Sequence, residues 1–133
     1  MGTVGRKRIL VVEDDPHLQA IMVRLLTKAG LDAVAADRGD RAFSILEQQS
    51  FNVLLLDQGL PDMTGVELLR RLRASKMRTP ALMVTGDTSA LEPESLCELG
   101  VVEIFSKPVD LHQLLEGIAR ACSQGPGAVP EEC

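Results

Sequence analysis

The segment that most constrains the fold of this chain is residues 53–57. The apolar run Val53–Leu56 ends at Asp57, and the turn residues Gly59 and Pro61 follow. Because a strand buried on both faces of a parallel sheet is apolar along its whole length, this run predicts a central strand. In open α/β sheets, ligands bind and reactions occur beyond the carboxyl ends of the strands. Asp57 therefore stands where a functional site is expected.

Four further strands and five helices are predicted, and they alternate along the chain. The strands are expected at residues 9–12, 31–36, 81–84 and 101–105, and the helices at residues 16–29, 39–49, 66–75, 92–99 and 111–122. Alternation of this kind predicts an α/β domain with a parallel sheet, right-handed connections and helices on both faces. The expected fold is the flavodoxin-like, doubly wound (βα)5 arrangement, one of the common arrangements of this class, whose five-stranded parallel sheet has the order 2-1-3-4-5.

Local signals set the helix ends and the limits of the domain. Thr64 with Glu67 three residues later is a capping box, which predicts the start of the third helix. Pro93 cannot lie inside a helix, so the fourth helix is expected to begin beside it and to be short. Residues 1–7 are expected to be a disordered lead-in, residues 8–122 the folded domain, and residues 123–133 a flexible tail or truncated linker.

Composition excludes several classes of function. The formal net charge is −5, which gives no reason to expect direct binding to nucleic acid. The basic residues 6–8 are followed by only four apolar residues before acidic residues begin, which is too short for the core of a signal peptide. No stretch is long and apolar enough to span a membrane. We therefore expect a soluble cytoplasmic domain without a membrane partner.

Polar side chains follow the predicted strands. Asp14 and Asp15 follow the first strand, Asp57 ends the third, Thr85 follows the fourth and Lys107 the fifth. In the 2-1-3-4-5 order the first and third strands are neighbours, so the three carboxylates would converge and repel one another. A hard divalent cation, either Mg²⁺ or Mn²⁺, would relieve this repulsion. With the lysine and the hydroxyl, such a site suits a phosphoryl group that a carboxylate attacks in line.

Taken together, these residues resemble the receiver domain of bacterial two-component response regulators. The resemblance covers residues 8–122. It rests on four groups of residues: Asp14-Asp15; Asp57 with Pro61 and Gly65; Thr85-Gly86; and Lys107-Pro108. Each group alone is a weak signal, but together, in order and at successive strand ends, they are specific. The resemblance also favours a cis peptide bond before Pro108.

The resemblance implies a phosphorylation switch rather than an enzyme. Asp57 would accept a phosphoryl group from a phosphohistidine of a sensor histidine kinase or a phosphotransfer protein. Asp15, Asp57 and the backbone carbonyl of Gly59 would ligate Mg²⁺ directly, and Asp14 would act through water. Thr85 and Lys107 would bind the phosphoryl oxygens and signal to an effector through the face formed by residues 86–122.

Three positions depart from the pattern usual in that family. Ile104 stands where a Tyr or Phe commonly changes position on activation, and Gly59 offers no side chain to influence hydrolysis of the phosphate. Pro93 shortens the fourth helix, which lies on the expected signalling face. These departures concern the read-out of the switch, whereas the residues for phosphoryl transfer are all present.

Two other classes of function fit the same fold. An aspartyl-phosphate phosphatase would have the motif Asp-x-Asp directly after the first strand, whereas this chain has Glu13-Asp14-Asp15. It would also need a cap over its substrate, and this chain has no inserted segment to form one. A phosphorylation-independent adaptor would be expected to lack one or more of the acidic residues or Lys107. A flavodoxin-like nucleotide module is disfavoured, because no Gly-rich or Ser/Thr-rich phosphate loop follows the first strand.

Overall fold

A computed structural model describes residues 6–124, apart from the side chains of Ala90 and Gln124. The predicted lead-in and tail therefore lie outside the described residues, except for residues 6–7 and 123–124. The strands are β1 (Arg8–Val12), β2 (Asp32–Ala36), β3 (Val53–Asp57), β4 (Ala81–Thr85) and β5 (Val101–Ser106). The helices are α1 (Pro16–Lys28), α2 (Gly39–Gln48), α3 (Gly65–Ala74), the 3-10 helix η1 (Thr88–Ala90), α4 (Pro93–Glu98) and α5 (Leu111–Gln124).

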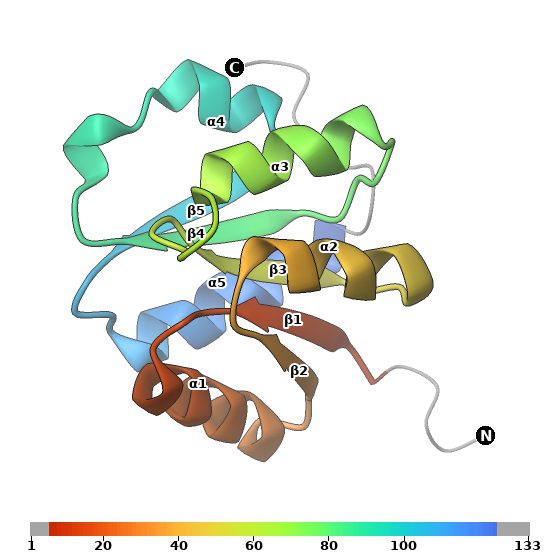
Figure 1. The fold of residues 1–133 in the computed structure, drawn as a ribbon. Helices are drawn as coiled ribbons and strands as arrows, with labels where there is room; N and C mark the ends of the chain where they lie inside the picture. Colours follow the sequence, from red (N-terminus) through yellow and green to blue (C-terminus); the bar gives the residue numbers. More distant parts are fainter. Residues whose placement is uncertain (1–5, 125–133) are drawn as a thin grey trace.

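The strands form one parallel sheet in the order β2-β1-β3-β4-β5, which confirms the predicted α/β fold and strand order. Figure 1 shows α2, α3 and α4 over one face of the sheet and α1 and α5 over the other. The chain order reverses between β1 and β3, which are direct neighbours. This reversal places the residues that follow β1 and end β3 side by side at the carboxyl edge of the sheet.

Alternate residues of the buried strands pack into two separate hydrophobic cores. In β3, Leu54 and Leu56 face the core beneath α2, α3 and α4, whereas Val53 and Leu55 face the core against α1 and α5. All four side chains are almost fully buried. Two-sided burial explains why the strand is apolar at every position instead of alternating, and why the first polar residue, Asp57, comes at its end.

Most helix starts follow the local signals in the sequence. Thr64 and Glu67 form the predicted capping box of α3, and Asp110 accepts N–H groups of the first turn of α5. Pro93 is the first residue of α4, which has only six residues, as its position predicts. Two features were not predicted: η1, and the continuation of α5 to Gln124, two residues beyond the expected end.

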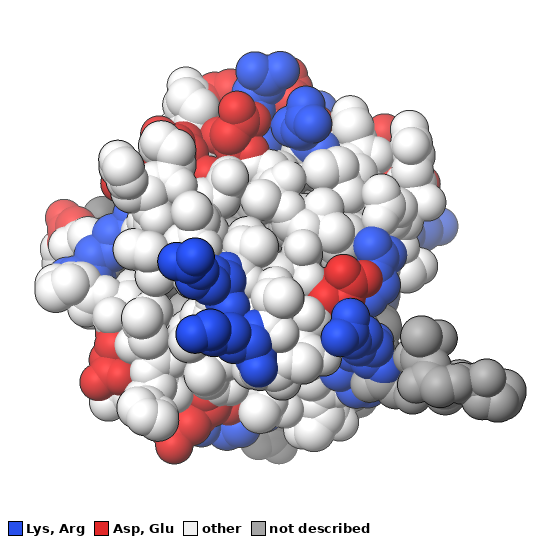
Figure 2. Space-filling view, turned by 90° about the horizontal axis from the view of Figure 1, so that it is seen from below, with Lys and Arg blue, Asp and Glu red and all other residues white. Residues whose placement is uncertain are grey.

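The face on the side of α1 carries mostly uncharged side chains at its centre. Figure 2 shows Lys and Arg there in small groups separated by uncharged surface, with acidic side chains mostly toward the rim. Ile21 of α1 is a large apolar side chain that remains 49% exposed.

Within the described chain, none of the helices combines the length and the apolar character needed to cross a bilayer.

We expect Leu54→Ala to lower the free energy of unfolding by about 2–5 kcal/mol, because the truncation leaves a cavity in a strand packed on both faces. Ile21→Ala is the matched control, since that side chain is half exposed, and it should cost less than about 1 kcal/mol. Denaturant unfolding followed by circular dichroism measures both values. Equal costs for the two variants would show that β3 is not at the centre of the core.

Candidate functional site

Three carboxylates meet where β1 and β3 end. Glu13, Asp14 and Asp57 each place one carboxylate oxygen within 4.8 Å of the others. Val12 pairs with Leu56, so Glu13 and Asp57, the next residues, occupy equivalent positions on neighbouring strands. Glu13 and Asp57 are buried, whereas Asp14 is exposed. The edge of the sheet therefore carries an acidic cluster in which two members are shielded from solvent.

The membership of this cluster differs from the set predicted from the sequence. Asp15, predicted as a direct metal ligand, lies at the N-cap of α1, where its Oδ1 accepts the N–H of His17 at 2.9 Å and of Leu18 at 3.4 Å. Glu13 belongs to the cluster, although it was not among the metal ligands predicted from the sequence. The pairing of Val12 with Leu56 puts the residue directly after β1 beside Asp57, and this register is a tertiary feature that the sequence does not show.

Lys107 brings the balancing positive charge. Its Nζ lies 3.3 Å from Asp57 Oδ2 and 3.7 Å from Glu13 Oε1. Partial burial lowers the pKa of Lys107, but the carboxylates of Asp57 and Glu13 outweigh this effect and hold the pKa above its ordinary value. The N–H of Lys107 donates to Thr85 O at 2.9 Å, and the peptide bond to Pro108 is cis, as predicted.

Glu13 is a buried carboxyl group whose protonated form is favoured in the folded chain. Burial raises its pKa to about 7; the N–H of Asp15 opposes this effect and the nearby Asp57 carboxylate adds to it. Oε2 accepts that N–H at 3.0 Å, but the buried Oε1 has no hydrogen-bond partner. A buried carboxylate oxygen without a donor, in a cluster of oxygen ligands only, fits a hard cation such as Mg²⁺.

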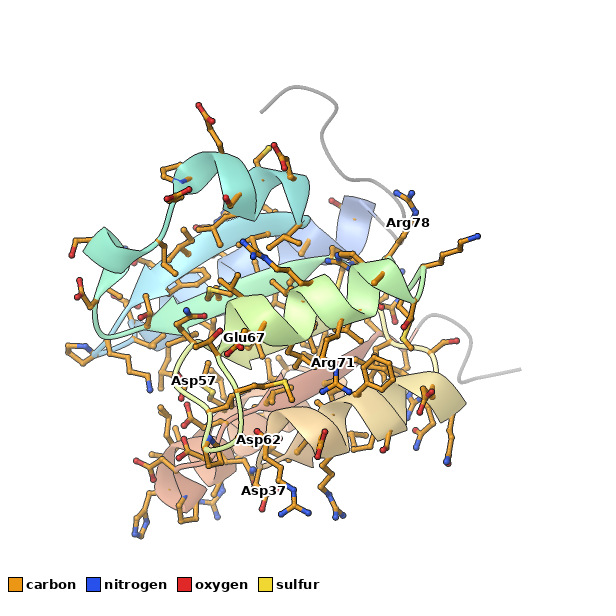
Figure 3. All side chains as sticks on the ribbon, turned by 45° about the horizontal axis from the view of Figure 1, so that its top comes forward. Asp37, Asp57, Asp62, Glu67, Arg71 and Arg78 are labelled. Carbon is orange, nitrogen blue, oxygen red and sulfur yellow. The ribbon has the colours of Figure 1, made fainter. Side chains whose placement is uncertain are left out.

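The other predicted site residues lie in the loop after β3 and at the end of β4, the strand beside β3. The N–H of Gly59 donates to Asp57 Oδ1 at 3.2 Å, and Gly59 also forms an isolated bridge with Thr64. Thr85 is buried, and its hydroxyl accepts the N–H of Asp87 at 3.2 Å. Gly65 allows close packing behind the site, because a Cβ atom there would lie only 3.0 Å from Asp57 O. Figure 3 shows Asp57 beside the loop that joins β3 to α3.

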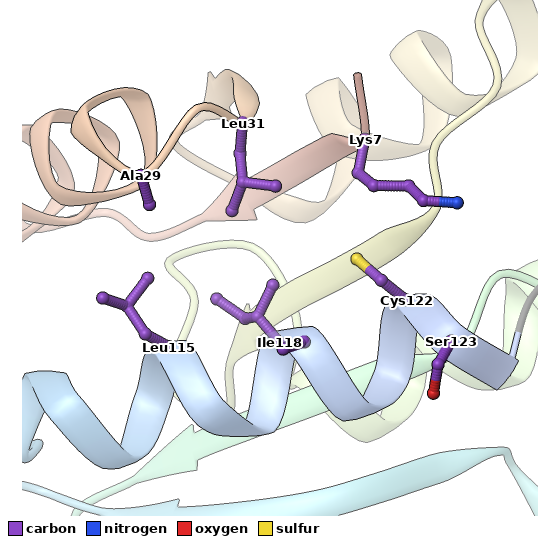
Figure 4. A pocket seen from close by; sticks show the side chains of 8 residues that line it. Lys7, Ala29, Leu31, Leu115, Ile118, Cys122 and Ser123 are labelled. Atoms are coloured by element: carbon purple, nitrogen blue, oxygen red, sulfur yellow. The ribbon is translucent and has the colours of Figure 1, made fainter. Parts of the chain in front are cut away.

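A separate groove of about 460 Å³ lies at the opposite edge of the sheet, between α1 and α5. Figure 4 shows Leu31, Leu115 and Ile118 pointing into it, with Lys7 and Cys122 at one end. None of the predicted site residues lines this groove. The chemistry-bearing side chains of the predicted set are therefore concentrated at the carboxyl edge.

Known proteins with similar sequences and structures share this architecture. The family model described as "Response regulator receiver domain" matches residues 9–119. Transcriptional regulatory protein TrcR of Mycobacterium tuberculosis is 34% identical over 119 residues, which are 87% of this chain and 46% of that protein. Transcriptional regulatory protein TcrA of the same species is 30% identical over 125 residues, which are 94% of this chain and 49% of that protein.

The chain thus spans about half the length of these curated relatives. Among solved structures, a response regulator receiver protein from Pseudomonas putida superposes with a TM-score of 0.79 at 31% identity, covering 88% of this chain and 98% of that one. The similarity therefore extends over the folded part of the chain and over nearly all of that receiver structure.

In metal-free protein, we expect Glu13→Gln to stabilise the fold relative to wild type by an amount that grows as the pH rises from 4.5 to about 7. The pKa of Glu13 is higher in the folded chain than its ordinary value of 4.5, so its proton favours folding. Wild type loses this contribution as the pH rises through about 7, whereas Gln does not titrate. Urea unfolding in EDTA at several pH values measures the difference.

The matched control is Glu47→Gln, which removes a carboxylate from the exposed surface of α2. If the free energy of unfolding of Glu13→Gln differed from that of wild type by the same amount at every pH, the pKa of Glu13 would not be raised in the folded chain.

Proposed function

Since this chain belongs to the response regulator receiver domain family, we propose that Asp57 is its phospho-acceptor in a two-component signalling pathway. The donor is a phosphohistidine of a sensor histidine kinase or a phosphotransfer protein. The observation that carries this proposal is the position of Asp57: it ends the central strand, in an acidic cluster, with Lys107 Nζ 3.3 Å from its carboxylate.

The residues around Asp57 suit an in-line phosphoryl transfer. A carboxylate oxygen of Asp57 forms a bond to phosphorus while the bond from phosphorus to the histidine nitrogen breaks, and the imidazole leaves. Lys107 lies close enough to Asp57 to stabilise negative charge on the transferring group. Little further chemistry is required of the protein, because positioning and charge stabilisation dominate phosphoryl transfer.

A divalent cation fits the acidic cluster. Glu13, Asp14 and Asp57, with the backbone carbonyl of Gly59, are the groups that would hold Mg²⁺ or Mn²⁺. The ion would neutralise charge on the carboxylates and on the phosphoryl oxygens. We assign Asp15 to capping α1 rather than to metal binding, because its Oδ1 already accepts two N–H groups of that helix.

The domain acts as a switch rather than as an enzyme that turns over a substrate. Thr85 is proposed to exchange its bond with Asp87 for one with a phosphoryl oxygen, which would alter the segment that leads into η1 and α4. The effector would read this change on the face formed by residues 86–122. Ile104 is β-branched and partly buried there, so it has fewer conformations with which to respond than an aromatic ring would have.

The kind of effector is suggested by the relatives. TrcR and TcrA are named transcriptional regulatory proteins and are about twice as long as the segment that aligns with this chain. We propose that this receiver controls an effector domain or protein of a similar regulatory kind, without touching nucleic acid itself. A phosphorylation-independent adaptor is the alternative that the first experiment below distinguishes.

We expect Asp57 to be phosphorylated by phosphoramidate or acetyl phosphate in the presence of Mg²⁺, because these small donors need only a competent acceptor site. Mass spectrometry of peptides should place the adduct on Asp57, and Asp57→Asn or addition of EDTA should abolish it. Asp37→Asn, which changes an exposed carboxylate, is the control and should be labelled normally. Undiminished labelling of Asp57→Asn would rule out this acceptor, and an unlabelled wild type would favour the adaptor.

We expect Mg²⁺ to raise the melting temperature, because a ligand that binds only the native state increases the free energy of unfolding. The increase is RT ln(1 + [L]/Kd), about 1.4 kcal/mol at about tenfold excess over Kd. Asp14→Ala should remove this Mg²⁺-dependent increase. Asp15→Ala should lower the free energy of unfolding by about 0.5–2 kcal/mol, because α1 loses its N-cap, and should therefore melt at a lower temperature. It should keep the Mg²⁺-dependent increase. Differential scanning calorimetry measures both effects. Loss of the increase in Asp15→Ala alone would return that residue to the metal site.

A further inference from the structure

The helix α2 begins without a capping side chain of its own. Its N-cap residue, Arg38, has extended backbone geometry and makes no side-chain cap hydrogen bond. The first N–H groups of a helix have no acceptor within the helix, so they need one from elsewhere. Here the acceptor is Asp62: Gly39 N donates to Oδ1 at 2.8 Å and Asp40 N donates to Oδ2 at 2.9 Å.

Asp62 belongs to the loop that follows Asp57, so its two hydrogen bonds connect the acceptor loop, residues 58–64, to α2. Figure 3 shows Asp62 in this loop beside the start of α2, near Asp37. Burial opposes the effect, but the N–H groups of Asp40 and Gly39 hold the pKa of Asp62 below its ordinary value. The carboxylate is therefore charged, and both of its oxygens are engaged, at the positive end of the helix.

The next residue strengthens the same connection. Met63 lies directly on Gly39, where a Cβ atom would come within 2.5 Å of the methionine sulfur. Glycine at this position therefore allows the loop to approach the helix start closely. Met63 Sδ is also 4.0 Å from a guanidinium nitrogen of Arg71, which lies over the ring of Phe43 at 5.1 Å. The tip of the acceptor loop thus packs against both α2 and α3.

The base of the loop is held by bonds near Asp57. Gly65 N donates to Gln58 O at 2.9 Å, Val66 N donates to Gln58 Oε1 at 3.0 Å, and Gly59 bridges to Thr64. The loop that carries Gly59 is therefore attached at its base to β3 and α3, and at its tip to α2 through Asp62 and to α2 and α3 through Met63. If the Asp62 hydrogen bonds to α2 were lost, the contacts at the base of the loop would be the main constraint on the backbone of Gly59.

We propose that Asp62 is a positioning residue, which holds the acceptor loop against the start of α2 and thereby sets the affinity for Mg²⁺ and the rate of phosphorylation of Asp57. This inference rests on the proposed function of the site and extends it to a residue that need not contact the metal or the phosphoryl group. Loss of the connection loosens the loop, and the proposed carbonyl ligand on Gly59 is then less well oriented.

The test separates positioning from simple helix capping. In Asp62→Ala, we expect the dissociation constant for Mg²⁺ to rise about tenfold and phosphorylation by phosphoramidate to slow at subsaturating Mg²⁺. The double variant Arg38→Ser/Asp62→Ala supplies α2 with a local cap and has the same net charge as wild type. It should regain the melting temperature of wild type but keep the weak Mg²⁺ binding. Asp37→Asn controls for removal of one nearby negative charge and should bind Mg²⁺ as wild type does.

Full recovery of Mg²⁺ affinity in the double variant would overturn the proposal and reduce Asp62 to a helix cap, as would unchanged affinity in Asp62→Ala. Amide hydrogen exchange of residues 58–66 should rise in both Asp62 variants, and unchanged exchange would also contradict the proposal. If wild type accepts no phosphate, the proposed function fails, but Mg²⁺ titration and amide exchange still decide the role of Asp62.

Discussion

The site depends on the balance of charge at the carboxyl edge of the sheet, where two buried carboxylates share one ammonium group. Burial of an unpaired carboxylate is costly, and Lys107 offsets this cost at 3.3 Å from Asp57 and 3.7 Å from Glu13. One positive charge does not balance the whole cluster. Burial, with a smaller contribution from the Asp57 carboxylate, raises the pKa of Glu13, and its buried Oε1 has no hydrogen-bond partner. This excess of negative charge is the physical basis for affinity toward a cation.

The sheet provides the rigid framework that this balance requires. The strands β1 and β3 are buried on both faces, so their register is fixed by packing from both sides. The residues that end them are held in place by the same packing. The acceptor loop after β3 is different, because hydrogen bonds to helix starts hold it, from Thr64 and Glu67 at α3 and Asp62 at α2, together with the packing of Met63 on Gly39. The acidic cluster and its surrounding loop are therefore stabilised by different interactions.

The predictions of the fold succeeded where the signals were local or periodic. Fully apolar strands, alternation with amphipathic helices and the capping box at Thr64 were sufficient to predict the strands, the five α-helices and the start of α3. The strand order was taken from the flavodoxin-like fold, and the structure confirms it. The short 3-10 helix η1 was missed because so short an element carries no hydrophobic periodicity; its start rests on the Asp87 side chain accepting the N–H of Ser89. The end of α5 was placed too early because the apolar stripe stops at Cys122, although the backbone hydrogen bonds continue.

The sequence by itself determined that acidic residues, a hydroxyl and a lysine follow successive strands, and hence that they meet at one edge of the sheet. It could not distinguish which of the consecutive acids Glu13, Asp14 and Asp15 enter the cluster. That depends on where β1 ends and α1 begins, and the structure places Glu13 beside Asp57 and turns Asp15 to the helix cap. The bond from Asp62 to the start of α2 likewise has no sequence signal. Two hydrogen bonds make this connection, between residues 22 and 23 positions apart, and only the packing of the loop on Gly39 brings these residues together.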